Sequence, residues 1–180
     1  MTQSKRDNTP LNAVLEDLHS AVEYDAVIVF KLENDYLTTI SHRGAAADVV
    51  TRRWSFPLRE WENLQPGSEN RHLVIMDAHA GSSQRQVLRT VTGAQLESCF
   101  GPFRSWVFLP LLIESQMVGL AVLAHHDPAY YLPERVQEVQ RLLADMAVSF
   151  QNAILHARSE QRAEEIQTLF AVQQAITSPL

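Results

Sequence analysis

The sequence has few cysteines and glycines and no long apolar run, and several common classes of protein depend on these features. It holds one cysteine, Cys99, among 180 residues, so no disulfide can form within it and a reducing compartment is expected. Its six glycines form neither a phosphate-binding glycine loop nor the Gly-x-Ser-x-Gly turn of a serine hydrolase. No apolar run approaches the roughly 18 residues needed to cross a bilayer, and the polar start MTQSKRDNTP lacks a signal-peptide core. We therefore expect a cytoplasmic protein without a membrane partner.

The charges and the histidines argue against two further classes of site. Lys and Arg number 15 against 21 Asp and Glu, and the net charge of −6 gives no electrostatic reason to expect nucleic acid. The run His125–Asp127 suggests a metal site, but neighbouring strand residues point to opposite faces, so the two imidazoles cannot easily share an ion. His72 and His79 are too far apart to pair, and no second cluster has ligand spacing. We expect no metal, assign no catalytic residue and expect no enzyme.

Hydrophobic periodicity predicts an α+β domain. Apolar residues at helical spacing follow Pro10, and proline suits the first turn of a helix. Segment 77–103 is mixed and polar, and is expected to form loops with one or two short helices. The expected strands are 25–32, 36–43, an edge piece around Phe56 beside Pro57, 72–76 as a short central strand, and two runs on either side of 114–116.

The second hairpin, RSWVFLPLLIESQMVGLAVLAHH, is apolar at nearly every position rather than at alternate ones. Such strands belong to a sheet that is covered on both faces. Alternation divides the first strand between the faces, with Trp106 and Phe108 on one and Val107, Leu109 and Leu111 on the other. Terminal helices are expected to cover the second face, and the irregular middle segment the first. A glycine inside a strand often marks a close backbone approach, so we expect one at Gly119.

Two stretches carry a resemblance to a known family. YDAVIVFKLENDYLTTISHRG, followed later by RSWVFLPLLIESQMVGLAVLAHHDPAYYLPERVQEVQRLLADMAVSFQNAIL, resembles a GAF domain over residues 11–157. The resemblance implies a GAF-like (profilin-like) α+β fold with a central antiparallel six-stranded sheet. Terminal helices would lie on one face, and loops with short helices would form a pocket on the other.

The resemblance also implies a function and a division of the chain. Residues 1–10 would be an N-terminal tail, and 158–180 resemble the linker helix that joins such domains to the next module of bacterial signalling proteins, such as sensor histidine kinases. The chain would then be a regulatory sensory module that binds a small molecule. Its output domain would be a missing part of the parent protein.

Aromatic residues gather in the segments expected to close over the pocket face. We interpret these rings and two neighbours as candidate ligand-binding residues: Trp54, Phe56, Met76, Phe103, Arg104, Trp106 and Phe108. The pocket would be apolar with few polar anchors, and neither its ligand nor a cofactor can be named from these residues. The same rings could instead fill the space and leave a ligand-free dimerisation domain, so this alternative stays open.

A helical pattern runs from Pro133 almost to the C-terminus, which is longer than one domain can cover. Its broad apolar stripe includes Leu142, Met146, Phe150 and Ala153, and fits a helix lying on a sheet. A thinner stripe on the opposite side continues beyond the domain after one slip in register: Ala144, Val148, Leu155, Ile166 and Leu169. We interpret this second stripe as the interface of a homodimer that forms a parallel coiled coil, with a solvated helix as the alternative.

Three kinds of GAF relative would change the function, and cysteine chemistry bears on two of them. Relatives that hold a linear tetrapyrrole attach it to a cysteine before this hairpin, usually beside a histidine, whereas Cys99 lies between Ser98 and Phe100. The free methionine sulfoxide reductase needs several cysteines for thiol exchange, and the Asn-Lys-Phe-Asp-Glu signature of the cyclic-nucleotide subgroup does not occur. A bilin-binding photoreceptor or an enzyme on this fold is kept as an alternative, and the role of Cys99 stays open.

Overall fold

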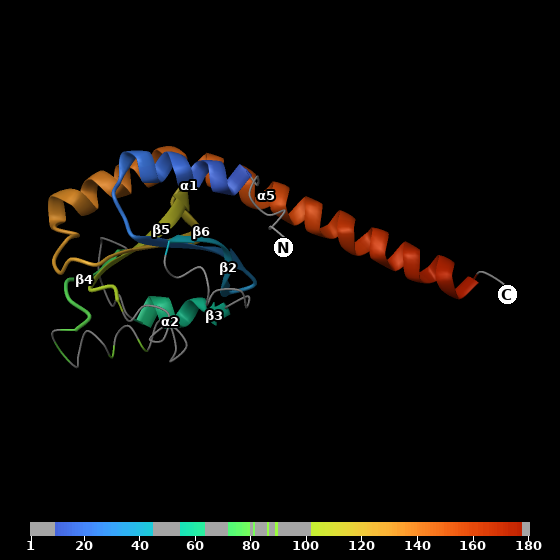
Figure 1. The fold of residues 1–180 in the computed structure, drawn as a ribbon, viewed down its shortest axis with the longest axis horizontal. Coiled ribbons are helices and arrows are strands. Elements are labelled where there is room, and N and C mark those ends of the chain that lie inside the picture. The colour runs from blue at the N-terminus through green and yellow to red at the C-terminus, as the bar shows by residue number, and fades with distance from the viewer. Residues whose placement is uncertain are drawn as a thin grey trace, which may run out of the picture.

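A computed structural model describes residues 10–44, 55–63, 72–79, 81, 86, 89 and 102–177 of the chain. Two of its helices lie on one face of a six-stranded sheet and a short helix lies on the other (Figure 1). The helices are α1 (Pro10–Ala21), α2 (Leu58–Asn63) and α5 (Pro133–Thr177). The strands are β1 (Ala26–Glu33), β2 (Tyr36–Gly44), β3 (Ser55–Pro57), β4 (Leu73–Ile75), β5 (Ser105–Ile113) and β6 (Gln116–His125). The predicted α+β class and six-stranded sheet are confirmed.

The sheet has the strand order β3-β2-β1-β6-β5-β4, and every neighbouring pair is antiparallel. The short strand β3 ends in Pro57 and lies at one edge, as the sequence predicts, because proline cannot donate to a ladder. The prediction of a central strand at 72–76 is wrong, since β4 forms the opposite edge. The centre is instead taken by β1, which pairs directly with the second strand of the long hairpin.

Both hairpins turn through two residues in the left-handed region. Asn34 and Asp35 have φ of 51° and 62°, and Glu114 and Ser115 have φ of 49° and 67°. Two successive left-handed residues are typical of a type I′ turn, whose twist matches that of the flanking strands. Gln116, expected in the second turn, therefore begins β6 instead.

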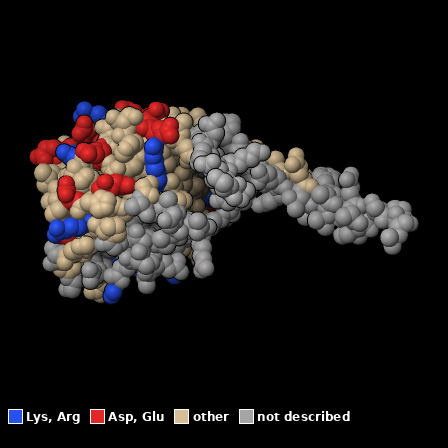
Figure 2. Space-filling model, in the orientation of Figure 1, with Lys and Arg blue, Asp and Glu red and all other residues tan. Residues whose placement is uncertain are grey.

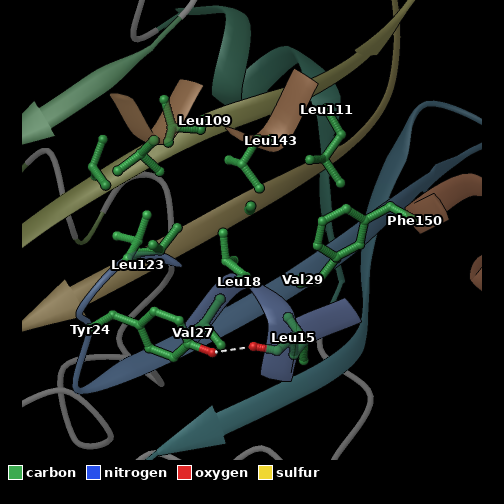
Figure 3. Packing of buried hydrophobic residues seen from close by; sticks show 14 of the residues in the cluster. Leu15, Leu18, Tyr24, Val27, Val29, Leu109, Leu111, Leu123, Leu143 and Phe150 are labelled. Atoms are coloured by element: carbon green, nitrogen blue, oxygen red, sulfur yellow. Dashed lines mark hydrogen bonds between the residues drawn. The ribbon is translucent and has the colours of Figure 1, made fainter. Parts of the chain in front are cut away.

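The core between the sheet and the two long helices is apolar and closely packed (Figure 3). Leu15 and Leu18 of α1 and Phe150 of α5 are at most 1% exposed, and they meet side chains from the central strands. Val107, Leu109 and Leu111 all belong to this core, which confirms the predicted division of β5 between its faces. The Tyr24 hydroxyl donates a hydrogen bond of 2.8 Å to the carbonyl oxygen of Leu15, and burial raises the pKa of Tyr24 to about 12.

The helix α5 has one part on the sheet and one beyond it. Phe150 and Ala153 are buried against the sheet, while Leu142 and Met146 pack at the margin of the same core, so the predicted sheet-facing stripe is confirmed. Among the side chains that the structure describes, Ala153 is the last of α5 in this core, yet the helix continues to Thr177 and projects away from the domain (Figure 1).

Gly119 on β6 lies where the backbone of β1 comes close. A Cβ atom at this position would clash with the carbonyl oxygen of Phe30 on β1 and would lie 3.4 Å from Cδ1 of Leu111 on β5. The predicted close backbone approach is confirmed, and it explains why a glycine stands in the middle of an otherwise apolar strand.

Candidate functional site

The face of the sheet opposite the long helices carries a cluster of aromatic side chains. Four predicted site residues belong to it, namely Phe56, Phe103, Trp106 and Phe108, and each is at most 5% exposed. The rings of Trp106 and Phe108 are stacked, with centroids 6.4 Å apart and planes 26° from parallel. Because these two residues alternate along β5, they lie on the same face, as the sequence predicts.

Neighbouring elements extend this aromatic cluster on both sides. Trp61 of α2 stacks on Phe108 with centroids 6.0 Å apart. Phe103 meets Trp106 edge-on at 5.9 Å, and its carbonyl oxygen accepts a hydrogen bond of 3.4 Å from Trp106 Nε1. Offset stacks and edge-to-face contacts are the favoured geometries of aromatic pairs, so the rings form a continuous apolar wall.

Trp61 and Thr39 also belong to this face, although neither is among the predicted site residues. Thr39 pairs with Phe30 in the ladder between β1 and β2, so the two side chains lie on the same face. It is 9% exposed, and its Oγ1 has no hydrogen-bond partner in the structure as described. The sequence does hold a signal for Trp61. It lies three residues after Leu58, which is helical spacing, and Pro57 is a favourable residue at the start of a helix.

The remaining candidate residues of the pocket have other surroundings. The Arg104 guanidinium forms a two-bond ion pair with Asp77, in which Nε lies 3.2 Å from Oδ1. The hydrogen bond from Arg104 lowers the pKa of the Asp77 carboxyl below its ordinary value. Met76 is half-buried but is not a member of the aromatic cluster, and Trp54 lies outside the described residues.

The second predicted site lies on α5, on the side that faces away from the sheet. Ala144 is exposed, and Val148, Leu155 and Ile166 are exposed by 58%, 54% and 53%. Leu169 lies in α5, but its side chain is outside what the structure describes. The four described residues are thus accessible to a partner.

Solved structures share this arrangement of sheet and helices. The GAF domain of a two-component sensor histidine kinase from Bacillus halodurans aligns with a TM-score of 0.60 at 16% identity, over 87% of this chain and 99% of that one. The GAF domain/HD domain protein from Geobacter sulfurreducens also gives 0.60, at 14% identity over 82% and 95% of the two chains. The chain has a GAF-domain fold.

Photoreceptors and a transcription regulator are also similar to this GAF-fold chain. The PixJ GAF domain from Thermosynechococcus elongatus, solved in its blue-light absorbing form, gives a TM-score of 0.52 at 16% identity, over 86% of this chain and 89% of that one. The anaerobic nitric oxide reductase transcription regulator NorR from Aliivibrio fischeri is 24% identical over an alignment of 162 residues that covers 84% of this chain. The chain spans only 28% of the length of that regulator. No protein-family model matches the sequence.

The surface of the GAF-fold chain adds two observations. Acidic side chains gather over the side that carries α1 and the start of α5 (Figure 2), where Glu16, Asp17, Glu134 and Glu138 are exposed. Among the described residues, no helix is long and apolar enough to cross a membrane, and no group of three or more His, Cys, Asp or Glu side chains could hold a metal ion.

Proposed function

We propose that this chain is the regulatory sensory module of a multidomain signalling protein in the cytoplasm. A small molecule would bind against the aromatic face, and the signal would leave through α5, which would pair with a second copy. The module would have no catalytic activity of its own. Its structural similarity to a GAF domain of a sensor histidine kinase and its sequence similarity to a transcription regulator support this role.

The two-sided character of α5 is the observation that carries this proposal. One side of the helix is buried in the core of its own domain up to Ala153, while Val148 and Leu155 on the other side are more than half exposed. The steps from Val148 to Leu155 and on to Ile166 are seven and eleven residues, both close to whole numbers of helical turns. These side chains therefore lie in one line along the helix.

A second copy of the chain is the partner that fits this line. Burial of each large apolar side chain contributes about 1.5–3 kcal/mol, and in a parallel dimer about a two-fold axis equivalent residues meet their own copies. The proposed interface comprises Ala144, Val148, Leu155, Ile166 and Leu169. We divide the chain accordingly into a sensory domain at 11–157 and a signalling helix at 158–180, which would continue into an output domain.

Sedimentation over a range of protein concentrations tests the dimer. Val148→Glu places a charge in the proposed interface and should weaken association at least tenfold, whereas Ser149→Glu is a matched control at a neighbouring exposed position and should not. Truncation after Ala157 should weaken the dimer but leave the domain folded, because the sheet-facing stripe remains. A full-length chain that stays monomeric at high micromolar concentration would contradict the proposal.

The ligand would be an apolar, planar small molecule, since the aromatic face offers rings and few polar groups. If the rings border a binding space, the Trp106→Ala variant should bind an apolar dye differently from the wild type, because it lacks the indole ring. If they only fill a core, the variant should lose about 3–5 kcal/mol of stability with dye binding unaltered. The second outcome would favour the alternative function of a ligand-free dimerisation domain.

Native mass spectrometry of the chain purified from its own host would show a retained small molecule directly. A visible absorption band that is lost in Cys99→Ser would instead favour the bilin-binding photoreceptor, a candidate suggested by the similarity to PixJ. No cofactor is assigned here.

A further inference from the structure

The loop that joins β6 to α5 is fixed to the sheet by a stack of three side chains. His125, the last residue of β6, is 8% exposed and lies parallel to the ring of Tyr130, with centroids 3.6 Å apart and planes 7° from parallel. The guanidinium carbon of Arg135, in the first turn of α5, lies 3.9 Å from the centroid of the same ring. Two groups this close to one ring must occupy its opposite faces. The stack therefore joins the end of the sheet to the start of α5.

The hydrogen bond that the His125 side chain accepts requires its imidazole to be neutral. Its Nδ1 accepts a hydrogen bond of 3.0 Å from the backbone N–H of Asp127. Only a neutral imidazole can accept at this nitrogen, because both ring nitrogens are donors in the protonated form. A proton on Nδ1 would therefore break this bond. Oδ2 of Asp127 lies 3.9 Å from the same nitrogen, so a proton on Nδ1 would favour this carboxylate as its acceptor in place of the contact with the amide.

A carboxylate is placed to favour the charged form of His125. Nε2 of His125 lies 3.7 Å from Oδ2 of Asp25, which also accepts from the backbone N–H and the Nδ1 of His126, each at 2.7 Å. Burial raises the pKa of Asp25, but the bonds from His126 and the charges of both histidines outweigh it and lower the pKa below its ordinary value. Asp25 thus remains an anion over the range in which histidine gains its proton.

Other charged and titratable groups surround the stack on every side. From the segment before β1, Glu23 accepts a hydrogen bond of 3.2 Å from the Tyr130 hydroxyl. Just before β5, the guanidinium of Arg104 interacts with the charge of Asp127. The side chain of His125 thus contacts Asp25, Asp127 and Tyr130, and Glu23, Arg104, His126 and Arg135 lie against those partners.

The same loop is tied to the edge of the sheet. The backbone N–H of Ala129 donates a hydrogen bond of 2.6 Å to the carbonyl oxygen of Met76, just after β4. Ala129 has φ of 53°, a conformation that residues with a Cβ seldom adopt. A rearrangement at Asp127 therefore meets a fixed point at Ala129, and its effect should pass along the stack to Arg135.

We propose that His125 is a pH-sensitive switch between the sheet and α5. Its protonation at Nδ1 breaks the hydrogen bond from the Asp127 amide and shifts the first turn of α5. This device goes beyond the proposed ligand response, because it responds to protons and lies in the loop that begins the helix. It also does not depend on dimerisation of α5.

Nuclear magnetic resonance of the isotope-labelled full chain, recorded between pH 8 and pH 5, tests this pH-sensitive switch. The side-chain nitrogens of His125 should change from the neutral form, unprotonated at Nδ1, to the doubly protonated form. The backbone amides of Asp127 and Arg135 should shift with the same midpoint. In His125→Asn the side-chain oxygen can still accept from the Asp127 amide but does not titrate, so both amide shifts should be lost. The matched variant His126→Asn should retain them.

Three results would overturn the proposal. One is a His125 ring that stays neutral down to pH 5, and another is a ring that titrates while the amides of Asp127 and Arg135 remain unchanged. The third is an unaltered amide titration in His125→Asn, which would assign the response to another group. The first two are read from the wild-type chain, so the test stands even if a variant fails to fold. None of them bears on ligand binding or on dimerisation.

Discussion

Adding one methyl group at Gly119 should destabilise the sheet at its centre. In Gly119→Ala the new Cβ would clash with the carbonyl oxygen of Phe30, which belongs to the backbone and cannot rotate away as a side chain can. Overpacking a close-packed interior costs about 1–3 kcal/mol, and we expect the upper part of this range. Loss of glycine's freedom in the unfolded chain offsets about 0.4–1 kcal/mol. The net loss should be about 1–2 kcal/mol.

Thermal and denaturant unfolding would measure this loss. For a chain of this size, about 1–2 kcal/mol corresponds to a fall of roughly 2–8 °C in Tm. Gly81→Ala is the matched control, because a Cβ at Gly81 would meet no atom within 4 Å and should leave stability within about 0.5 kcal/mol of wild type. A Gly119→Ala variant with the midpoint of the wild type would refute the close approach of β1 and β6.

Two further predictions concern polar contacts on either side of the sheet. Tyr24→Phe should lose about 0.5–1.5 kcal/mol of stability in a denaturant titration, because it removes the buried bond to Leu15, whereas Tyr36→Phe at a half-exposed position should be neutral. The pKa of Asp77 is lower in the folded chain than in the unfolded one because Arg104 binds its anion, so this contribution is present above about pH 4 and is lost as the pH falls through the folded pKa. The stability difference between wild type and Asp77→Asn should therefore shrink on acidification, and a difference that stays constant would contradict the pairing.

Local patterns were sufficient to predict much of the fold. Alternation along β5 placed Trp106 and Val107 on opposite faces, because successive strand residues point to opposite sides whatever the rest of the chain does. Helical periodicity likewise predicted that Phe150 faces the sheet. The glycine in β6 indicated a close approach, although the partner, Phe30, could not be named from the sequence.

Contacts between distant segments could not be predicted in the same way. The edge position of β4 depends on its pairing with β5, about thirty residues later, and a three-residue strand carries no signal of its neighbours. Asp25 and His126 meet across 101 positions of sequence. From the sequence alone, the run His125–Asp127 therefore suggested only a metal site that its spacing disfavours, although its partners in the fold are an aspartate and a stacked tyrosine.

Disulfide cross-linking along α5 tests the central claim, that one side of this helix serves its own domain and the other a second copy. In a Cys99→Ser background, single cysteines at Leu155 or Ile166 should form symmetric disulfide dimers on mild oxidation, since both positions are more than half exposed on the proposed interface. A cysteine at Phe150, which is 0% exposed, should not. Efficient cross-linking at Phe150, or none at Leu155 and Ile166, would contradict the account.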